Sequence, residues 1–349
     1  MTVYVAYRGG LHVVDVDESG APHDGSPDGV LLADRDVECL AVHPDAPDRV
    51  FAGTFGGGLY RTADGGDSVE RVGVDGIDHD AVTAVATSPV DPDEVWVGTE
   101  PSRLYRSTDG GDSFEEVSGV ATVPSAPEWS FPPRPDTHHV RWIEACPADP
   151  ERWYVGVEAG ALVVTPDGGG TWIDRPPGSR RDNHTLATHP DAPDRVYAAA
   201  GDGYAESDDR GATWTTPQDG LDHRYVWGLA VDPGDPDTVL ASAAAGAGDA
   251  HRRGNAYLYR KRGSSSPVTD GRADGPDAGS ATTWERLDDR GIPTGEGTYR
   301  AVLAAGVAPG ELWAVHDRGL YRTRDAGDSF DRVPVRLPEA TPRALVVAP

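Results

Sequence analysis

The sequence predicts an all-β fold: one seven-bladed β-propeller over residues 1–349, built of four-stranded antiparallel blades, with one blade closed by both termini. Three observations predict it. A short phrase recurs five times, and four strand-like segments surround each copy. The first and last segments of the chain together match one further unit. Repeats of about 20–50 residues indicate solenoids or propellers, and four short strands per unit are typical of a propeller blade.

The recurring phrase reads Ser/Thr-x-Asp-x-Gly-x-Ser/Thr, usually followed by an aromatic residue. We call its five copies the aspartate turns, after their central residues Asp64, Asp109, Asp167, Asp209 and Asp325. An aspartate can accept backbone N–H groups across a turn, and glycine adopts the positive φ that a tight turn needs. We therefore expect the aspartate turns to be structural, with the aromatic residue packed between blades.

The aspartate turns resemble the Asp-box, also called the BNR repeat, of sialidases, Asp-box xyloglucanases, sortilin-type receptors and photosystem assembly factors. The resemblance implies that each turn is a hairpin of one propeller blade, on the face away from the ligand. It implies no single activity, because the group includes both glycosidases and binding proteins. The early Arg-Ile-Pro motif of sialidases is absent, and xyloglucanases use two propellers where this chain has one.

Each unit aligns with the others over its four strands. The first strand ends in His-Pro or an equivalent, and the third reads Gly-Leu-Tyr-Arg or similar. The alignment predicts blades at 36–78, 79–120, 138–178, 182–221, 223–290 and 298–336, with the seventh made of 340–349 joined with 1–18. A blade shared by both termini leaves no free sheet edge. The fifth unit lacks the turn and carries a Ser/Gly/Asp-rich insert, 263–283, which we expect to be a surface loop.

Charge restricts the choice of partners. The chain has 58 acidic and 31 basic residues and a net charge of −27. It resembles salt-adapted, halophilic proteins of the haloarchaeal type, because a dense carboxylate surface stays soluble where molar salt reduces the Debye length to about 3 Å. Nucleic acids and anionic membranes demand basic surfaces, so neither is an expected partner. We expect a cytoplasmic monomer without cofactor or metal, since the chain starts with a strand-like segment and no apolar stretch approaches about 20 residues.

The first strands carry the candidate site. Aligned without gaps, they place polar or aromatic residues at one common position, namely Glu38, Thr83, Arg141, His184, Trp227, Arg300 and Arg343. Further along, the interior positions are apolar: Leu40, Val85, Ile143, Leu186, Leu229, Val302 and Leu345. Propeller ligands bind where loops enter the innermost strands. We therefore predict an arginine-rich pocket at the channel mouth, with ligand-binding residues Arg141, His184, Trp227, Arg300, Arg343, His139, Arg224 and Tyr299.

Convergent guanidinium groups favour a ligand- or partner-binding module for an anionic small molecule, glycan or peptide. In the alternative without a ligand, the arginines pair with Glu38, Glu144 and Glu158 and plug the channel, as in an assembly scaffold. A glycoside hydrolase, sialidase- or xyloglucanase-like, is the other alternative. Its two carboxylates would lie about 5–5.5 Å apart if retaining or about 6.5–9.5 Å if inverting. The candidates are Glu38, Glu100, Glu158 and Asp317.

A proline-rich loop over 121–137 carries Trp129 and Phe131. Exposed aromatic side chains on a stiff loop would suit stacking on a sugar ring. The alternative is that the loop folds over the edge of its blade.

Overall fold

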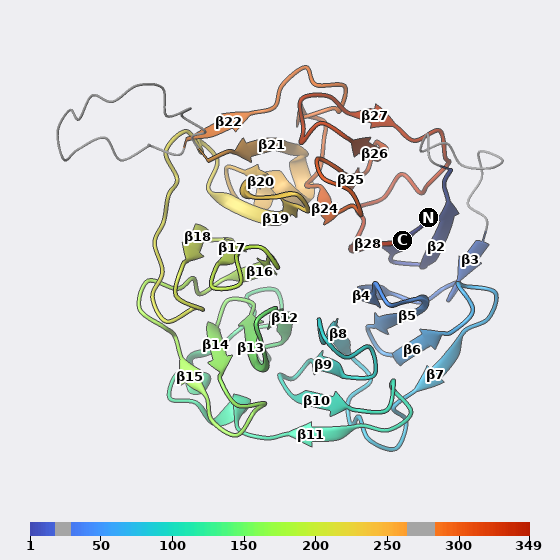
Figure 1. Cartoon of the computed structure of the whole chain (residues 1–349), viewed down its shortest axis with the longest axis vertical. Helices are drawn as coiled ribbons and strands as arrows, with labels where there is room; N and C mark the ends of the chain where they lie inside the picture. Colours follow the sequence, from blue (N-terminus) through green and yellow to red (C-terminus); the bar gives the residue numbers. More distant parts are fainter. Residues whose placement is uncertain (18–28, 264–282) are drawn as a thin grey trace.

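The structure is a computed structural model that describes residues 1–17, 29–263 and 283–349. Its strands form seven sheets arranged as blades around a common axis (Figure 1), which confirms the predicted seven-bladed propeller. Every sheet is antiparallel, and its first strand lies nearest the axis. Most of the predicted insert lies outside the described residues.

Blades 1 to 4 follow the chain. Blade 1 contains β4 (Val37–His43), β5 (Ala46–Thr54), β6 (Gly58–Thr62) and β7 (Glu70–Val72). Blade 2 contains β8 (Val82–Thr87), β9 (Val95–Thr99), β10 (Leu104–Ser107) and β11 (Glu115–Val117). Blade 3 contains β12 (Val140–Cys146), β13 (Asp149–Val157), β14 (Ala161–Thr165) and β15 (Ile173–Asp174). Blade 4 contains β16 (Asn183–Thr188), β17 (Val196–Ala200) and β18 (Gly203–Ser207), and a single bridge between Glu206 and Thr215 stands for its fourth strand.

Blades 5 and 6 have the same plan. Blade 5 contains β19 (Tyr225–Asp232), β20 (Asp235–Ala244), β21 (Asn255–Lys261) and β22 (Trp284–Arg286), and β23 (Gly295–Glu296) also pairs with β21. Blade 6 contains β24 (Val302–Ala305), β25 (Leu312–His316), β26 (Gly319–Thr323) and β27 (Asp331–Arg332). The helical turns η1 (Val120–Thr122), η2 (Ala126–Glu128) and η3 (Asp249–Arg253) lie in connecting loops.

Blade 7 closes the ring. It combines β28 (Ala344–Ala348) with β1 (Thr2–Tyr7), β2 (Gly10–Asp15) and β3 (Gly29–Leu31). The C-terminal β28 pairs with β1 in a register that runs from Thr2 opposite Ala348 to Ala6 opposite Ala344. The two ends of the chain therefore share one sheet, as the sequence predicted, and the hydrogen bonds between β28 and β1 close the ring.

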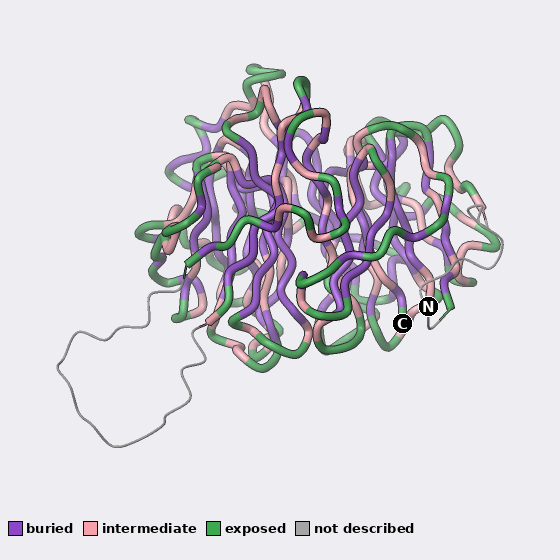
Figure 2. The backbone as a smooth tube through the Cα atoms, turned by 90° about the horizontal axis from the view of Figure 1, so that it is seen from above, coloured by how far each residue is buried: buried purple, intermediate pink, exposed green. Residues whose placement is uncertain are grey.

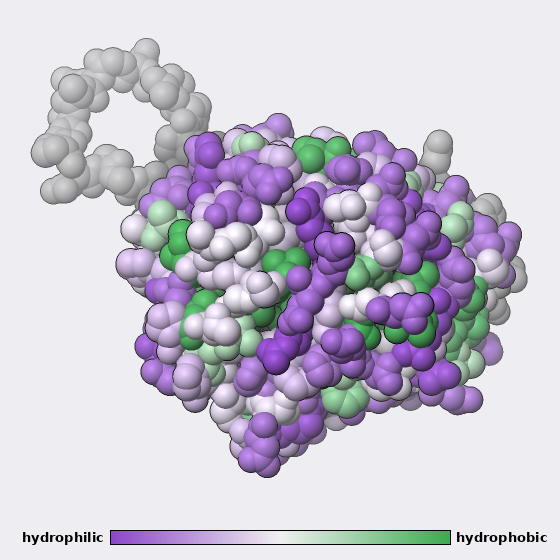
Figure 3. Space-filling model, turned by 90° about the horizontal axis from the view of Figure 1, so that it is seen from below, coloured by the Kyte–Doolittle hydropathy of each residue, from purple (hydrophilic) through white to green (hydrophobic). Residues whose placement is uncertain are grey.

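The core lies between neighbouring blades. Trp96 of blade 2 stacks on Trp153 of blade 3 with ring centroids 4.8 Å apart, and both side chains are buried. Figure 2 shows buried residues along the strands and exposed residues mainly in the loops at the two faces. The side seen in Figure 3 is mostly hydrophilic, with scattered apolar areas. Cys39 and Cys146 are buried free thiols. Within the described ranges, no helix is both long and apolar enough to span a membrane.

The five aspartate turns share one set of hydrogen bonds. In the second turn, Asp109 accepts bonds from the Ser107 hydroxyl at 2.8 Å, the Ser113 backbone N–H at 2.9 Å and the Ser113 hydroxyl at 2.6 Å. The Ser107 hydroxyl in turn accepts the Gly111 N–H at 2.9 Å. The other four turns repeat all four bonds. These bonds, chiefly those from Ser113, lower the pKa of Asp109 to about 2.

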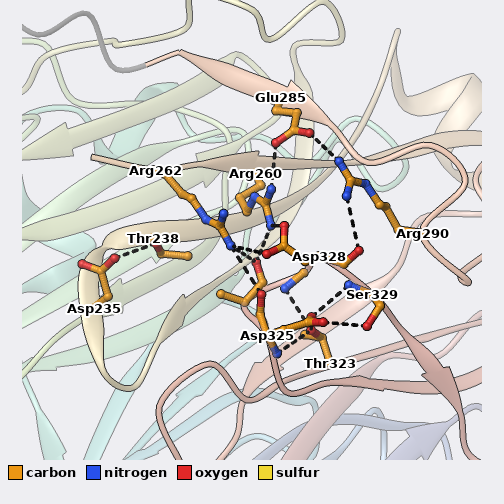
Figure 4. A network of polar contacts seen from close by, with 12 residues as sticks. Asp235, Thr238, Arg260, Arg262, Glu285, Arg290, Thr323, Asp325, Asp328 and Ser329 are labelled. Carbon is orange, nitrogen blue, oxygen red and sulfur yellow. Dashed lines mark hydrogen bonds and ion pairs between the residues drawn. The ribbon is translucent and has the colours of Figure 1, made fainter. Parts of the chain in front are cut away.

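The aspartate turns also join neighbouring blades. The aromatic residue after a turn backs onto a glycine at the end of the preceding blade, so that a Cβ on Gly178 would lie 2.3 Å from the Trp214 carbonyl oxygen. At the fifth turn, the buried Arg260 of blade 5 donates to Glu285 and Asp328 at 2.8 Å each (Figure 4). Arg61 of blade 1 makes the same kind of bridge to Asp112 of the second turn, at 2.7 Å. The turns are therefore part of the blade-to-blade framework.

Candidate functional site

The predicted column of first-strand residues coincides with a repeated irregularity of the backbone. In β4, Val37 pairs with Thr54 and Cys39 with Gly53, so Glu38 has no partner in the ladder. The ladders of β8, β12, β16 and β19 shift in the same way at Thr83, Arg141, His184 and Trp227. A bulge re-aims the side chain of its extra residue. Five blades thus use one backbone device to present different side chains at one end of the channel.

Glycines opposite these bulges let adjacent blades approach closely. A Cβ on Gly53 would lie 2.6 Å from Cγ1 of Val82 in blade 2, and a Cβ on Gly98 would lie 2.5 Å from Cγ1 of Val140 in blade 3. Both distances are shorter than van der Waals contact, so only glycine fits. The bulges therefore stand close together around the axis.

A cavity of about 620 Å³, which we call the mouth cavity, opens at this end of the channel. Of the predicted ligand-binding residues, it is lined by His139, Arg141, Trp227 and Arg343. Further along the strands, the channel narrows to an apolar section of about 280 Å³. All seven predicted apolar positions line this section, namely Leu40, Val85, Ile143, Leu186, Leu229, Val302 and Leu345. The polar-to-apolar change along the first strands therefore corresponds to two successive parts of the channel.

The three column arginines differ in their partners. Arg343 donates to Glu38 Oε1 at 2.6 Å. Arg141 lies with its guanidinium carbon 5.1 Å from the Trp227 ring centroid, and its Nε is 3.6 Å from Glu158 Oε2. That separation is too long for a hydrogen bond, and no other described residue is hydrogen-bonded to the Arg141 side chain. Arg141 therefore lines the mouth cavity with N–H donors that make no hydrogen bond to another described residue.

Arg300 is 1% exposed and lies behind the cavity wall. Its guanidinium carbon is 3.8 Å from the Trp227 centroid, and its Nε–H donates to His251 Nδ1 at 3.2 Å. Among the described residues, its two terminal nitrogens have no hydrogen-bond partner. Burial, together with the charges of Arg343 and Arg141, lowers the pKa of Arg300 well below its usual range. The Arg300 guanidinium thus stands, buried and without a carboxylate partner among the described residues, behind the wall that Trp227 forms.

Three of the four candidate carboxylates gather at the mouth. Glu158 Oε2 lies 3.0 Å from His139 Nε2, and the other ring nitrogen of His139 lies 3.6 Å from Glu100 Oε2. Arg134 forms a bidentate pair with Glu100. Burial tends to raise the pKa of Glu158, but the hydrogen bond from His139 and the charges around it lower the pKa to about 2. Glu38 and Glu100 are thus held in ion pairs, and Glu158 stays ionised.

The remaining predicted residues lie elsewhere. Tyr299 and Asp317 line a second cavity of about 940 Å³, beside Arg318. The Asp317 carboxylate accepts the Tyr299 N–H at 2.9 Å and pairs with Arg318 at 3.2 Å. Arg224 is exposed and belongs to the lining of neither cavity. His184 is fully buried beside Trp227, with ring centroids 4.6 Å apart.

The proline-rich loop folds over its blade. Trp129 is 5% exposed and donates its indole N–H to Ser125 Oγ at 2.9 Å, so it offers no stacking surface. Of the two alternatives for this loop, the structure shows the folded one for Trp129, because its apolar ring packs into the core between blades 2 and 3. Phe131 lines the mouth cavity, where its ring lies edge-on to His139. The loop therefore contributes one aromatic side chain to the cavity.

Sequence reasoning missed Arg134 and Asp182, which both line the mouth cavity. Arg134 lies in the irregular proline-rich loop, where no alignment between repeats exists. Asp182 directly precedes β16 and lies two positions before the column residue His184. The sequence signal that could have identified Asp182 is an acidic residue two positions before a histidine of the column.

Comparisons with known proteins agree on architecture. No family model and no curated protein matches the chain. Among solved structures, the GH74 xyloglucanase from Xanthomonas campestris is 18% identical with a TM-score of 0.61, over 94% of this chain and 50% of that one. The GH74 enzyme from Niastella koreensis is 16% identical with a TM-score of 0.64, over 93% and 50%. YCF48 bound to D1 peptide is 18% identical with a TM-score of 0.55, over 85% and 81%.

The chain spans half the length of these GH74 enzymes and most of the length of YCF48. Identities below 20% support a shared fold, a seven-bladed propeller, and leave function to the side chains of the site.

Proposed function

We propose that the chain is a binding propeller that recognises an anionic group of a small molecule, glycan or peptide in the mouth cavity. The observation that carries this proposal is Arg141, whose guanidinium lies along the face of Trp227 and lines the cavity without a hydrogen bond to any described residue. A planar guanidinium held by an aromatic ring is oriented for bidentate recognition of a carboxylate, sulfate or phosphate.

The charge around Arg141 supports the same ligand class. The described lining of the mouth cavity contains five arginines and four carboxylates: Arg8, Arg134, Arg141, Arg252 and Arg343 with Asp36, Glu38, Glu158 and Asp182. The buried Arg300 adds a further positive charge behind the wall. The arginines and carboxylates at the mouth nearly balance once Glu100, the partner of Arg134, is counted. In a chain of net charge −27, this near-neutral cavity repels an anion less than the rest of the surface, and Arg141 offers it a guanidinium that makes no hydrogen bond to another described residue.

A glycoside hydrolase is the second candidate, favoured by the GH74 neighbours and by Glu158 at the cavity wall. The binding function is better supported, because Glu38 and Glu100 are committed to ion pairs and Trp129 is buried. As parts of the same proposal, the aspartate turns are Asp-box (BNR) repeats, and the protein is a halophilic, cytoplasmic monomer whose acidic surface is adapted to molar salt.

The test is calorimetry in molar KCl with a chelator present, using sugar acids, sulfated glycans, phosphorylated ligands and peptide carboxylates beside their neutral analogues. Only the anionic members should bind. Arg141→Ala should weaken binding at least about tenfold, the loss expected for a charge-assisted pair. Arg224→Ala, which removes an exposed arginine outside the cavity, is the matched control. Equal affinity of Arg141→Ala and the parent would overturn the proposal, and turnover of an oligosaccharide would favour the hydrolase.

A further inference from the structure

Three potential metal ligands meet where blades 3 and 4 adjoin. Glu158 follows β13, Asp182 precedes β16, and His184 is the bulged residue of β16. One ligand atom from each residue lies within 4.8 Å of the other two. Glu158 and Asp182 also line the mouth cavity, so an ion held here would have open coordination positions toward it.

One ring nitrogen of His184 faces the two carboxylates. The side chain is 0% exposed, and its Nδ1 lies 2.8 Å from the Val226 carbonyl oxygen, which can only accept a hydrogen bond. Nδ1 therefore carries the proton, and in the neutral ring Nε2 presents its lone pair. Among the described residues Nε2 has no hydrogen-bond partner, and it faces Asp182 Oδ1 at 3.8 Å and Glu158 Oε1 at 3.9 Å. In the neutral ring this lone pair would face two carboxylate oxygens, and a cation between the three atoms would be bound by all of them.

The surroundings hold the three groups in place. Glu158 uses Oε2 for His139, which leaves Oε1 on the side of His184. Asp182 Oδ1 accepts the Ala159 N–H at 2.9 Å. Gly201 provides the room for this carboxylate, since a Cβ there would lie 1.9 Å from Asp182 Oδ2. Metal-binding histidines commonly donate their second ring N–H to a backbone carbonyl, as His184 does to Val226.

We propose that Glu158, Asp182 and His184 form a site for one divalent transition-metal ion of the Mn²⁺ or Zn²⁺ kind. One imidazole and two carboxylates suit these ions better than Ca²⁺ or Mg²⁺, which prefer oxygen ligands alone. Ligands about 2.1 Å from a tetrahedral ion lie roughly 3.4 Å from one another. The distances from His184 Nε2 to Asp182 Oδ1 and Glu158 Oε1, 3.8 and 3.9 Å, therefore need to shorten by only about half an ångström. This proposal departs from the expectation of a protein without a metal, and it does not depend on the proposed anion binding.

The competing account is a protonated His184 that holds the two carboxylates as a buried ion pair. Titration with Mn²⁺ separates the two accounts. After treatment with a chelator, the chain is titrated in molar KCl, where weak surface binding is screened, and free Mn²⁺ is followed by electron paramagnetic resonance. We expect one saturable site per chain and a higher melting temperature in the presence of Mn²⁺. The absence of a stoichiometric site in the parent chain would overturn the proposal.

Three variants locate the site. Asp182→Asn and His184→Gln should each weaken Mn²⁺ binding at least about tenfold. Gly201→Ala removes no ligand, and its φ is compatible with alanine, yet its Cβ displaces Asp182 and should weaken binding several-fold. Asp136→Asn and His79→Gln, outside the cluster, are the matched controls. If His184→Gln fails to fold, Asp182→Asn and Gly201→Ala still test the proposed metal site. If Asp182→Asn and Gly201→Ala both bind Mn²⁺ as tightly as the parent chain, the metal site is contradicted. This result is separate from the anion test, which is done with a chelator present.

Discussion

The aspartate turns and the mouth cavity are both built from polar residues at the ends of strands, but they differ in how completely these residues are hydrogen-bonded. Both oxygens of Asp109 accept hydrogen bonds from within its own turn, and the other four turns repeat the pattern. At the mouth, buried nitrogens of Arg300, Arg343 and His184 have no hydrogen-bond partner among the described residues. Unpartnered buried polar groups destabilise a fold, so they are expected where a ligand completes the set.

The two regions also differ in repetition. The five turns use the same residue types at the same positions, because each must make the same hairpin. The seven column positions share a backbone position but carry five different residue types. Uniform residues at equivalent positions thus identify the framework of a repeat protein, and varied residues identify its site.

The largest effect should come from the glycine of an aspartate turn. Gly169 has a φ of 96°, and a Cβ there would lie 2.2 Å from Cγ1 of Val117 in the preceding blade. Gly169→Ala combines backbone strain with overpacking and should lower the free energy of unfolding by roughly 2–5 kcal/mol, measured by denaturant titration. Affinity for the anion should not change. Gly170→Ala is the control, because the second, fourth and fifth turns carry Asp112, Ala212 and Asp328 at this position; equal destabilisation by both substitutions would contradict the account.

The second test compares two buried arginines. Arg300 is 1% exposed and pairs with no carboxylate among the described residues, whereas Arg260, 3% exposed, is paired with Glu285 and Asp328 beside the fifth turn (Figure 4). Arg260→Met should lower the free energy of unfolding by about 2–4 kcal/mol, because it removes the charge-assisted hydrogen bonds of a buried guanidinium to Glu285 and Asp328. Arg300→Met should leave stability unchanged or raise it by up to about 2 kcal/mol, because it removes an uncompensated buried charge.

The same Arg300→Met variant should weaken anion binding several-fold, since the charge behind Trp227 is lost. Thermal unfolding and calorimetry in molar KCl measure both quantities. A marked loss of stability in Arg300→Met, with anion affinity preserved, would remove the distinction between the framework and the site.

The sequence predicted the architecture because the turn chemistry is local. Asp109, Gly111 and Ser113 lie within five residues, and their hydrogen bonds need no distant partner. The pairing of the two termini and the apolar channel section followed from repetition alone. What could not be predicted depends on contacts across blades. The sequence named Glu38, Glu144 and Glu158 as possible partners of the column arginines, but it could not say that Arg343 pairs with Glu38, 305 positions earlier in the chain. The approach of Asp182 to Glu158 has no local pattern either.

The third prediction concerns Glu144, which faces the apolar channel section and accepts hydrogen bonds from Trp142 and Thr188. Burial raises its pKa from 4.5 to about 7. The folded chain therefore keeps this proton between pH 4.5 and 7 after the unfolded chain has released it, so this group makes the fold less stable as the pH rises through that window. Glu144→Gln should match the parent near pH 4.5 and exceed it by about 1–2 kcal/mol at pH 8. Parallel profiles of melting temperature against pH would contradict the assignment.

The smallest effect should come from a single carboxylate of an aspartate turn. Hydrogen bonds hold the pKa of Asp109 near 2, below its ordinary 3.8, so its contribution to stability is present above about pH 4 and is lost as the pH falls toward 2. Asp109→Ala should lower the melting temperature by roughly 2–4 °C at neutral pH, as the loss of a capping carboxylate does, and by nothing measurable near pH 2. Asp75→Ala, an exposed aspartate outside the turns, is the control. Anion affinity should be the same in all three chains, because the hydrogen bonds of the turn are self-contained; a selective loss of affinity in Asp109→Ala would show that the framework and the mouth are energetically coupled.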